Sequence, residues 1–271
     1  MGGAKARMMS EARDMMKEME EHGFKPSVIT YTSLIEAYCM EKDFQTAGRT
    51  QEALDIFDKV RNDGCAPDAS FYNSLIYILG RAGRLEDANS VVGKMRMTGV
   101  PPTVATFNTL ISAACDHSQA ENALKMLVKM DEQSCKPDIK TYTPLLKLCC
   151  KRQWIKVLRF LICHMFRKDI TPDFSTYTLL VTWLCRNGKP AQSCLFLEEM
   201  VLKGFAPKKE TFDLVAEKLD KANLHSAKKK IQLLTLQAAA VKHNGSPCLG
   251  KDSAAGRHYD ELSNVFGHDE P

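Results

Sequence analysis

Short apolar stripes recur along this chain at a fixed interval and are separated by polar segments. Prolines stand 35 residues apart, and an aromatic residue follows each of them five residues later. The prolines are Pro67, Pro102, Pro137, Pro172 and Pro207, and the aromatic residues are Tyr72, Phe107, Tyr142, Tyr177 and Phe212. Pro26 and Tyr31 begin the series one unit earlier, and that unit is six residues longer. Regular self-similarity of this kind indicates a repeat architecture.

We number each repeat so that the aromatic residue is position 4 and the proline is position 34. The full units are then 28–68, 69–103, 104–138, 139–173 and 174–208. We expect residues 1–27 to hold the second helix of a partial leading repeat and 209–240 to form a degenerate terminal repeat. Residues 241–271 lose the periodicity and gather Gly, Ser, Asp and His, so we expect a disordered tail there.

Each unit predicts two helices joined by a sharp turn. Apolar residues at positions 7 and 8 follow the aromatic residue at helical spacing and predict a first helix near positions 3–14. A small residue at position 20 and apolar residues at 24 and 27 predict a second helix near positions 17–29. Gly48, Gly83 and Gly188 at position 15 fit the turn, because glycine adopts a left-handed backbone at little cost. Pro144 and Pro190 are expected in the first turns of their helices, where proline is tolerated.

A single helix pair cannot bury its own apolar face, so neighbouring units must stack. We therefore expect an all-α fold, an α-solenoid of stacked two-helix 35-residue repeats. The chain opens in the middle of a repeat, with Ala12 already in a second-helix column and no polar cap before it. We expect a fragment of a longer array or a shortened relative.

Charge and hydropathy add few constraints on function. The formal net charge of +4 weakly favours an anionic partner. No apolar run approaches the length of a membrane span, and the first residues lack the apolar core of a secretory signal. The N-terminal stretch is also too short to be a transit peptide. We expect no membrane partner.

The cysteines follow the repeat, and no catalytic motif is present. Of ten cysteines, Cys39, Cys115, Cys150 and Cys185 occupy position 12, and Cys65 and Cys135 occupy position 32. Metal or redox chemistry is the alternative, but we interpret these residues as small apolar fillers that recur because the unit recurs. The sequence contains no Cys-x-x-Cys pair, no His-Glu-x-x-His, no phosphate-binding glycine-rich loop and no Gly-x-Ser-x-Gly. We expect no enzyme activity, cofactor, metal or small-molecule substrate.

The columns resemble those of pentatricopeptide repeat proteins, with a P-class-like array. One second half reads Gly83-Arg84-Leu85-Glu86-Asp87-Ala88, and the next unit begins Val104-Ala105-Thr106-Phe107-Asn108-Thr109-Leu110-Ile111. The match covers about residues 12 to 227, and the period agrees together with a dozen columns. The related tetratricopeptide repeat has a 34-residue period and a different pattern, which this chain lacks.

The resemblance implies binding of single-stranded RNA, one nucleotide per repeat. Positions 5 and 35 would read the base edge, position 2 would flank the base, and a basic residue at position 13 would approach phosphate. The 5/35 pairs are Thr32/Asp68, Asn73/Thr103, Asn108/Asp138, Thr143/Asp173 and Thr178/Lys208. The position 2 residues are Ile29, Ser70, Ala105, Lys140 and Ser175, and the basic residues at position 13 are Arg81, Lys151 and Arg186.

The family's code translates these pairs into a short RNA target. Thr with Asp prefers G, Asn with Asp prefers U, and Asn with Thr leans towards a pyrimidine. We predict a core of 5′-G-Y-U-G-3′, with the last repeat unassigned because Lys208 is atypical.

Two further functions stay open beside RNA reading. Position 2 is apolar in the family, whereas only Ile29 would sandwich a base well here. A helical scaffold for a protein partner, or an adaptor subunit of an RNA-processing complex, is therefore the alternative. By resemblance we expect the chain in mitochondria or chloroplasts, in RNA processing, stability or translation, and otherwise in the cytoplasm.

Overall fold

The computed structural model describes residue 11 and residues 14–40 and 47–243, and every regular element among them is an α-helix. The chain forms two compact units, residues 1–148 and 149–271, and the boundary falls inside one helix. The first helices of the repeats are α2 (Val28–Met40), α4 (Ala69–Arg81), α6 (Val104–Asp116), α8 (Ile139–Arg152), α10 (Phe174–Arg186) and α12 (Lys209–Lys221). The second helices are α3 (Ala47–Asn62), α5 (Leu85–Met97), α7 (Ala120–Glu132), α9 (Ile155–Arg167), α11 (Pro190–Leu202) and α13 (His225–His243).

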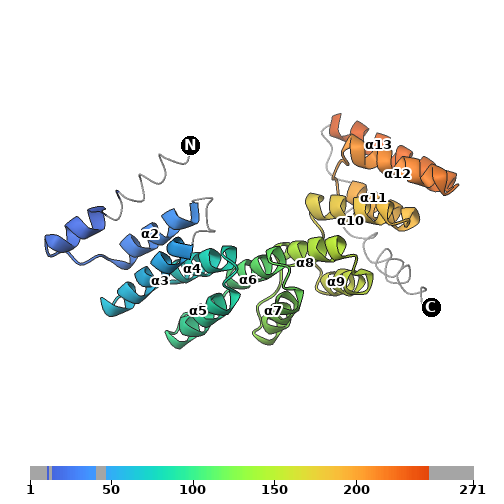
Figure 1. Cartoon of the computed structure of the whole chain (residues 1–271). Helices are drawn as coiled ribbons and strands as arrows, with labels where there is room; N and C mark the ends of the chain where they lie inside the picture. The colour runs from blue at the N-terminus through green and yellow to red at the C-terminus, as the bar shows by residue number, and fades with distance from the viewer. Residues whose placement is uncertain (1–10, 12–13, 41–46, 244–271) are drawn as a thin grey trace. The chain divides into compact units, whose positions relative to one another are not determined.

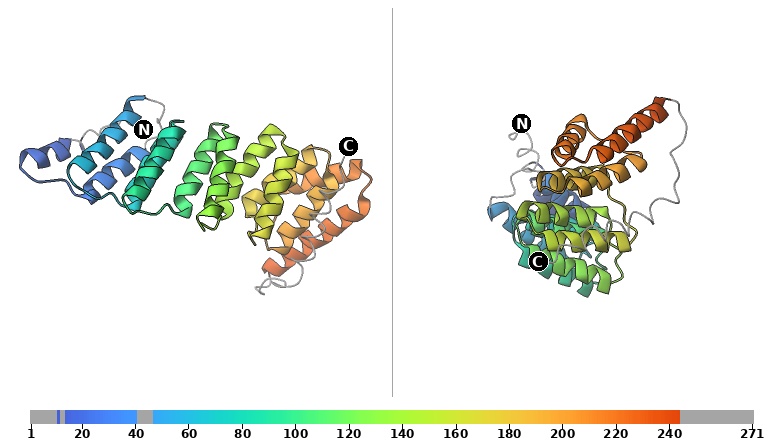
Figure 2. Two further views of the ribbon diagram at one scale, coloured as in Figure 1. Left: turned by 90° about the horizontal axis from the view of Figure 1, so that it is seen from below. Right: turned by 90° about the vertical axis from the view of Figure 1, so that its right-hand side faces the viewer.

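In the first unit the first helices stack directly on one another. Helix α4 contacts both α2 and α6, and each first helix packs against its own second helix (Figures 1 and 2). In the second unit α10 packs on α12 and α11 packs on α13, so the same two-layer arrangement recurs. The predicted all-α solenoid of stacked helix pairs is confirmed.

The recurring apolar columns form the core of both units. The position 4 residues Tyr31, Tyr72, Phe107, Tyr142 and Tyr177 are at most 1% exposed. The small residues at position 20 and the methionines at position 27 are also buried, including Ala88, Ala123, Met95 and Met130. The methionine column therefore fills the seam between helices, where its flexible side chain packs well.

The second helices α5, α7, α9 and α11 occupy positions 17–29, as the sequence predicts. The first helices begin at position 1, two residues earlier than predicted, and the residue at position 35 occupies their N-cap. Glycine or a residue with positive φ fills position 31, as at Gly99 and Ser134, where each second helix ends.

Three local predictions were wrong. Gly48 lies inside α3, which begins at Ala47, and not in the turn before it. Pro144 is the sixth residue of α8 and so lies beyond the first turn. Helix α13 continues to His243, three residues past the predicted end of the terminal repeat. The extra residues of the first unit and the predicted tail from 244 onwards lie outside the described residues, as does Ala12.

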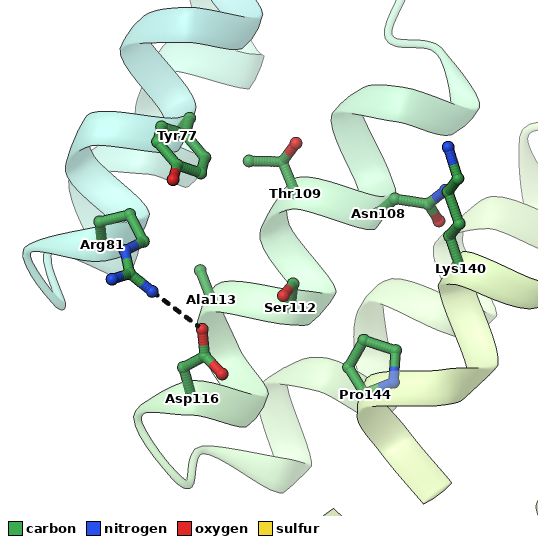
Figure 3. Close-up of a pocket in the computed structure, with 9 residues that line it drawn as sticks. All are labelled: Tyr77, Arg81, Asn108, Thr109, Ser112, Ala113, Asp116, Lys140 and Pro144. Carbon is green, nitrogen blue, oxygen red and sulfur yellow. Dashed lines mark ion pairs between the residues drawn. The ribbon is translucent and has the colours of Figure 1, made fainter. Parts of the chain in front are cut away.

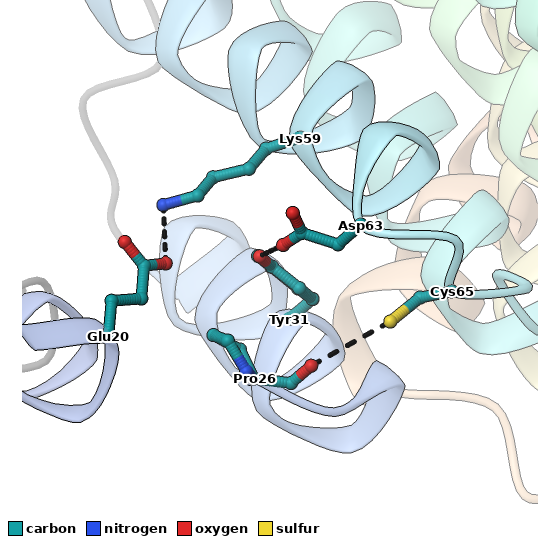
Figure 4. A network of polar contacts seen from close by, with 6 residues as sticks. All are labelled: Glu20, Pro26, Tyr31, Lys59, Asp63 and Cys65. Atoms are coloured by element: carbon teal, nitrogen blue, oxygen red, sulfur yellow. Dashed lines mark hydrogen bonds and ion pairs between the residues drawn. The ribbon is translucent and has the colours of Figure 1, made fainter. Parts of the chain in front are cut away.

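The end of the leading half-repeat is tied to the first full repeat (Figure 4). Lys59 forms an ion pair with Glu20 of the leading half-repeat, and within the first full repeat the Tyr31 hydroxyl donates a hydrogen bond to the Asp63 carboxylate. The Cys65 thiol donates to the Pro26 carbonyl at 3.7 Å. Burial, followed by the Asp63 contact, raises the pKa of the Tyr31 hydroxyl well above its ordinary value, so it stays a donor.

The position 32 cysteines share a role in joining loops. Cys135 donates to the Pro102 carbonyl at 3.7 Å, which is the same contact that Cys65 makes two repeats earlier. Each thiol therefore connects the loop after one repeat with the loop after the preceding repeat. Within the described residues, no cluster of three or more His, Cys, Asp or Glu side chains could hold a metal ion.

The lysine run in α13 makes intramolecular ion pairs. Lys228 pairs with Asp220, and the Lys230 ammonium lies 2.7 Å from a carboxylate oxygen of Glu198, which is 4% exposed. A buried carboxylate is costly without a partner, so Lys230 stabilises the packing of α11 on α13. Among the described helices, none combines the length and apolar character that crossing a bilayer requires.

Candidate nucleic-acid interface

The predicted base-reading residues at position 5 lie on the first helices, directly after the buried aromatic residue. All five are half-buried: Thr32, Asn73, Asn108, Thr143 and Thr178. Partial burial restricts their rotamers while leaving an edge in contact with solvent. This is the exposure that a side chain needs to recognise a ligand with a fixed geometry.

The three threonines at position 5 use their hydroxyl hydrogen within their own helix. Thr32, Thr143 and Thr178 each donate to the carbonyl four residues earlier at 2.8 Å. A hydroxyl has one hydrogen and two lone pairs, so each oxygen remains an acceptor. A threonine held in this way presents an acceptor to a ligand.

The two asparagines at position 5 are oriented by the next repeat. Asn73 accepts a hydrogen bond from the Thr106 hydroxyl at 2.7 Å, and Asn108 accepts one from Thr141 at 2.6 Å. Both threonines are fully buried at position 3 of the following first helix. The contact fixes which end of the amide faces the neighbouring helix, and leaves the amide nitrogen on the outer side.

The residue at position 35 caps the following first helix. Asp68 accepts from the Phe71 backbone N–H at 2.8 Å, Asp173 from that of Thr176 at 2.8 Å, and Asp138 from that of Thr141 at 3.0 Å. Thr103 and Lys208 also occupy the N-cap, but the Lys208 side chain makes no capping bond. The carboxylates thus satisfy backbone donors that would otherwise lack a partner.

Sequence reasoning assigned position 35 to base reading alone and missed this second role. The signal was available, because Asp or Thr directly before an apolar-periodic segment is typical of a helix start. The same residue therefore serves both the fold and the candidate site.

One predicted pair is brought together by a hydrogen bond. The Asn108 amide nitrogen donates to a carboxylate oxygen of Asp138 at 3.0 Å, while the Thr141 hydroxyl donates to Asn108 and the Thr141 backbone N–H donates to Asp138. Thr32, Asn73 and Thr178 make the contacts described above instead. The remaining pair is Thr143 and Asp173, of which Thr143 lies in the first unit and Asp173 in the second.

Asn108 also lines an open pocket of about 400 Å³ on the first-helix surface of the first unit. Helices α4, α6 and α8 each contribute residues to it (Figure 3). The lining residues are Tyr77, Arg81, Asn108, Thr109, Ser112, Ala113, Asp116, Lys140 and Pro144. Three of the predicted site residues, at positions 5, 2 and 13, therefore meet here although they come from three successive repeats.

The pocket carries charge of both signs. The Arg81 guanidinium lies 3.6 Å from the Asp116 carboxylate, and both side chains are about half exposed. An exposed pair at this distance is weak, so an anion can compete for the guanidinium. Lys140 is exposed on the opposite wall (Figure 3). Since Pro144 has no N–H, it cannot satisfy the Lys140 carbonyl in the usual helical way.

Tyr77 is a pocket residue that sequence reasoning missed. It lies on α4 at position 9, and 38% of it is exposed. Position 9 has no recurring residue type, because the other full repeats have Glu36, Ser112, Lys147 and Thr182 there. Comparison of the repeats therefore could not single out Tyr77. Its ring supplies an aromatic face where the position 2 residues Ser70 and Ala105 supply none.

The other predicted residues are exposed as expected of a ligand-contacting row. All position 2 residues are exposed, and Ile29 is 77% exposed. Ser70 donates to Glu36 at 3.1 Å and Ser175 to Asp173 at 2.9 Å, so these two serines are held by neighbouring carboxylates. Lys151 and Arg186 are exposed near the ends of α8 and α10 in the second unit.

Burial raises the pKa of the position 12 thiols Cys39, Cys150 and Cys185, which favours their protonated form. It raises the pKa of Cys150 to about 12 and that of Cys39 to about 11. Cys39 and Cys185 donate weakly to carbonyls of the next first helix, at 3.5 Å. These thiols act as packing groups.

Three family descriptions match most of the repeat region. The pentatricopeptide repeat domain matches residues 14–81 and 55–117, the PPR repeat family matches 102–151, and the PPR repeat matches 175–205. A pentatricopeptide repeat-containing protein of Arabidopsis thaliana is 31% identical over 80 residues, which are 28% of this chain and 13% of that protein. A mitochondrial one from the same plant is 40% identical over 61 residues, which are 22% of this chain and 11% of that protein. The chain thus spans a small part of these relatives.

Solved structures share the fold. The maize pentatricopeptide repeat protein PPR10 is 21% identical, with a TM-score of 0.56 over 86% of this chain and 38% of that one. The PPR domain of Arabidopsis thaliana protein-only RNase P 1, solved in complex with tRNA, is 21% identical, with a TM-score of 0.55 over 65% of this chain and 93% of that one. PPR10 bound to an 18-nt psaJ RNA element is also 21% identical, with a TM-score of 0.55 over 68% and 26%.

Proposed function

The chain belongs to the pentatricopeptide repeat family, and from this premise we propose that its first helices bind single-stranded RNA, one base per repeat. The observation that carries the proposal is the pocket around Asn108. There a half-buried amide, hydrogen-bonded to Asp138, lies between Lys140 and Arg81. A directional polar group flanked by cations suits a ligand that has both a base edge and a phosphate.

The hydrogen-bond inventory supports the proposed preferences. Threonine at position 5 offers an acceptor, and aspartate at position 35 offers another. The Watson–Crick edge of guanine carries the N1–H and N2–H₂ donors, so two acceptors complement it. Thr32 with Asp68 therefore fits G, and Thr143 and Asp173 are the same residue types at the same two repeat positions.

Asn108 offers a different set of groups. Its amide retains one N–H after the bond to Asp138, and its oxygen retains one lone pair after the bond from Thr141. Uracil presents carbonyl acceptors on both sides of its N3–H donor. A donor beside acceptors complements this edge, so Asn108 with Asp138 fits U and the proposed core is 5′-G-Y-U-G-3′.

Phosphate and ring contacts would complete each base site. Arg81, Lys151 and Arg186 lie exposed near the ends of their first helices, where they can approach the backbone. In the pocket, Tyr77 would supply the aromatic face that position 2 lacks, since stacking on a tyrosine stabilises any base. Binding of this kind would protect or position a transcript without chemistry by the repeats themselves.

We propose a mitochondrial or chloroplast location for the protein. One curated relative is a mitochondrial pentatricopeptide repeat protein, and another is small ribosomal subunit protein mL103 of Arabidopsis thaliana. Imaging a fluorescent fusion of the complete gene product together with organelle markers tests this. A purely cytosolic signal would overturn it.

The base-reading register is tested by exchanging one position 5 residue. Thr143→Asn should move the preference of its repeat from G to U, because the side chain then gains a donor. In vitro selection from a randomised RNA pool measures the preference base by base. An unchanged base at that site would show that position 5 does not read RNA in this chain.

A further inference from the structure

The net positive charge of the chain is concentrated in one short segment. Residues 151–168 contain six basic side chains and no acidic one, which leaves 31 basic and 33 acidic residues for the rest of the chain. The six are Lys151, Arg152, Lys156, Arg159, Arg167 and Lys168, and all are exposed. The segment comprises the end of α8, all of α9 and the residues beside them, and lies within the second unit.

Helix α9 has two chemically distinct faces. Its inner face buries Leu158, Leu161, Ile162 and Met165 in the core. Its outer face carries Phe160, which is 57% exposed and stacks on His164 with ring centroids 5.7 Å apart. Trp154 and Ile155 at the helix start are 39% and 42% exposed. Phe160 therefore lies exposed among cations on this face, and Trp154 is partly exposed at the N-cap beside its start.

The equivalent surfaces of α5 and α7 lack this composition. At position 18, α5 and α7 carry Glu86 and Glu121, whereas α9 carries Lys156. A cation in the first turn opposes the helix dipole, so Lys156 is unfavourable for the helix itself. At position 22, α5 and α7 carry Ser90 and Lys125, and α9 carries Phe160. A break with local preference in one repeat points to a role outside folding.

We propose that the outer face of α9 is a second, sequence-independent contact surface for single-stranded RNA. Lysine and arginine neutralise phosphates, and the rings of Phe160 and Trp154 offer stacking faces that accept any base. An acidic protein would be attracted by the charge but would not need flat, exposed rings. The surface also begins at Lys151, which is the proposed phosphate contact of its repeat, so one strand can reach both. This inference goes beyond base reading by the first helices and does not depend on it.

Trp154 gives a local optical probe for this surface. The chain has two tryptophans, and the other, Trp183, is buried with its ring N–H donating to the Cys150 carbonyl at 2.9 Å. Titration with a 20-nucleotide oligouridylate should quench the fluorescence of the unaltered chain. Trp154→Phe should abolish the quenching, because Trp183 is shielded from RNA. Equal quenching in both proteins would overturn the proposal.

Two double charge-reversal variants test how much the basic residues of α9 contribute to RNA affinity. Lys156→Glu with Arg167→Glu alters α9, and Lys125→Glu with Lys129→Glu makes the same change in total charge on the outer face of α7. The α9 variant should bind every RNA about tenfold more weakly than the α7 variant. Its log–log salt slope should fall in magnitude by about 1.4, since each phosphate contact on a single strand contributes roughly 0.7. Circular dichroism shows whether both variants keep their helices.

The outcomes separate this proposal from base reading. The preference for G-U-U-G over a shuffled RNA should be the same in the α9 variant and in the unaltered chain. If no protein shows that preference but the α9 variant still binds RNA more weakly, base reading fails and the α9 surface stands. Equal affinities of the α9 and α7 variants overturn the proposal. So does displacement of RNA by poly-L-glutamate as readily as by oligouridylate, which would assign the face to an acidic protein.

Discussion

Residues at position 35 combine a structural and a recognition role in the same carboxylate or hydroxyl group. Asp68, Asp138 and Asp173 cap the following first helix through backbone N–H groups. Side chains that cap helices well are Asn, Asp, Ser and Thr, so any variant chosen to change base preference at this position also has to cap. The chemistry available for base reading at position 35 is therefore restricted by the fold.

Asp138→Ala should lower the free energy of unfolding by about 1 to 2 kcal/mol, because it removes the side-chain cap of α8 and the acceptor of the Asn108 amide. Urea denaturation followed by circular dichroism measures the change. Lys208→Ala is the matched control, since Lys208 occupies the same position without a capping bond. It should change stability by less than about 0.5 kcal/mol. Similar losses in both variants would contradict the capping role.

Buried thiols give a second prediction for single residues. Burial raises the pKa of Cys150 and of Cys194 to about 12 from 9.0, so at pH 8 their thiolate fraction is on the order of a thousandfold below that of an unperturbed thiol. Iodoacetamide labelling followed by peptide mass spectrometry should modify the half-buried Cys163 faster than the buried Cys150 and Cys194. Labelling of Cys150 at the rate of Cys163 in the folded protein would contradict this.

At the scale of single helices, the two internal prolines differ in what they cost. Pro190 is the first residue of α11, where its missing N–H would have no partner anyway. Pro144 lies one turn further into α8, where it removes a helical hydrogen bond to Lys140. Its position in the pocket wall suggests that the lost stability is tolerated because of the site.

Pro144→Ala should raise the free energy of unfolding by about 1 to 3 kcal/mol, because a proline inside a helix is roughly 3 kcal/mol worse than alanine. Pro190→Ala provides the control and should change it by less than about 0.5 kcal/mol, since proline is well tolerated at N1. Thermal and urea unfolding of the two variants measure the difference. A stability gain no larger for Pro144→Ala than for Pro190→Ala would mean that α8 is not strained by its proline.

Helix positions could be predicted well from the sequence because the period repeats the same apolar columns. The second helices begin at position 17 as expected, and the buried aromatic, alanine and methionine columns match the core. The earlier start of the first helices could not be predicted from the apolar pattern, because the N-cap residue at position 35 is polar and does not belong to that pattern. Gly48 entered a helix because the first full unit has a different length, so its column no longer marks the turn.

The candidate site was less predictable, because its features depend on individual residues. Tyr77 has no counterpart in other repeats, so a search for recurring columns cannot detect it. The Arg81–Asp116 pair joins position 13 of two neighbouring repeats, and its charges become relevant only when these helices are known to stack. The pairing of Lys230 with Glu198 depends on the packing of α11 against α13. This packing cannot be predicted from the sequence of the last repeat, because its columns are degenerate.

At the scale of the whole molecule, two kinds of surface are proposed to contact RNA. The first helices present half-buried polar side chains with fixed orientations, which suit discrimination between bases. The outer face of α9 presents exposed cations and the exposed ring of Phe160, which suit affinity without discrimination. Few repeats can read only a short sequence, so a sequence-independent surface would increase affinity where base reading alone gives little.

The measurement that tests the central claim most directly is a titration of the purified chain with short single-stranded RNAs at several salt concentrations. RNAs containing G-U-U-G or G-C-U-G are compared with shuffled RNAs of the same composition. The account predicts tighter binding of the two designed RNAs, and a log–log salt slope of roughly −0.7 for each phosphate contacted. Equal affinity for designed and shuffled RNAs would contradict base reading by the first helices. No binding to any RNA at low salt would contradict RNA binding altogether and leave a protein scaffold as the function.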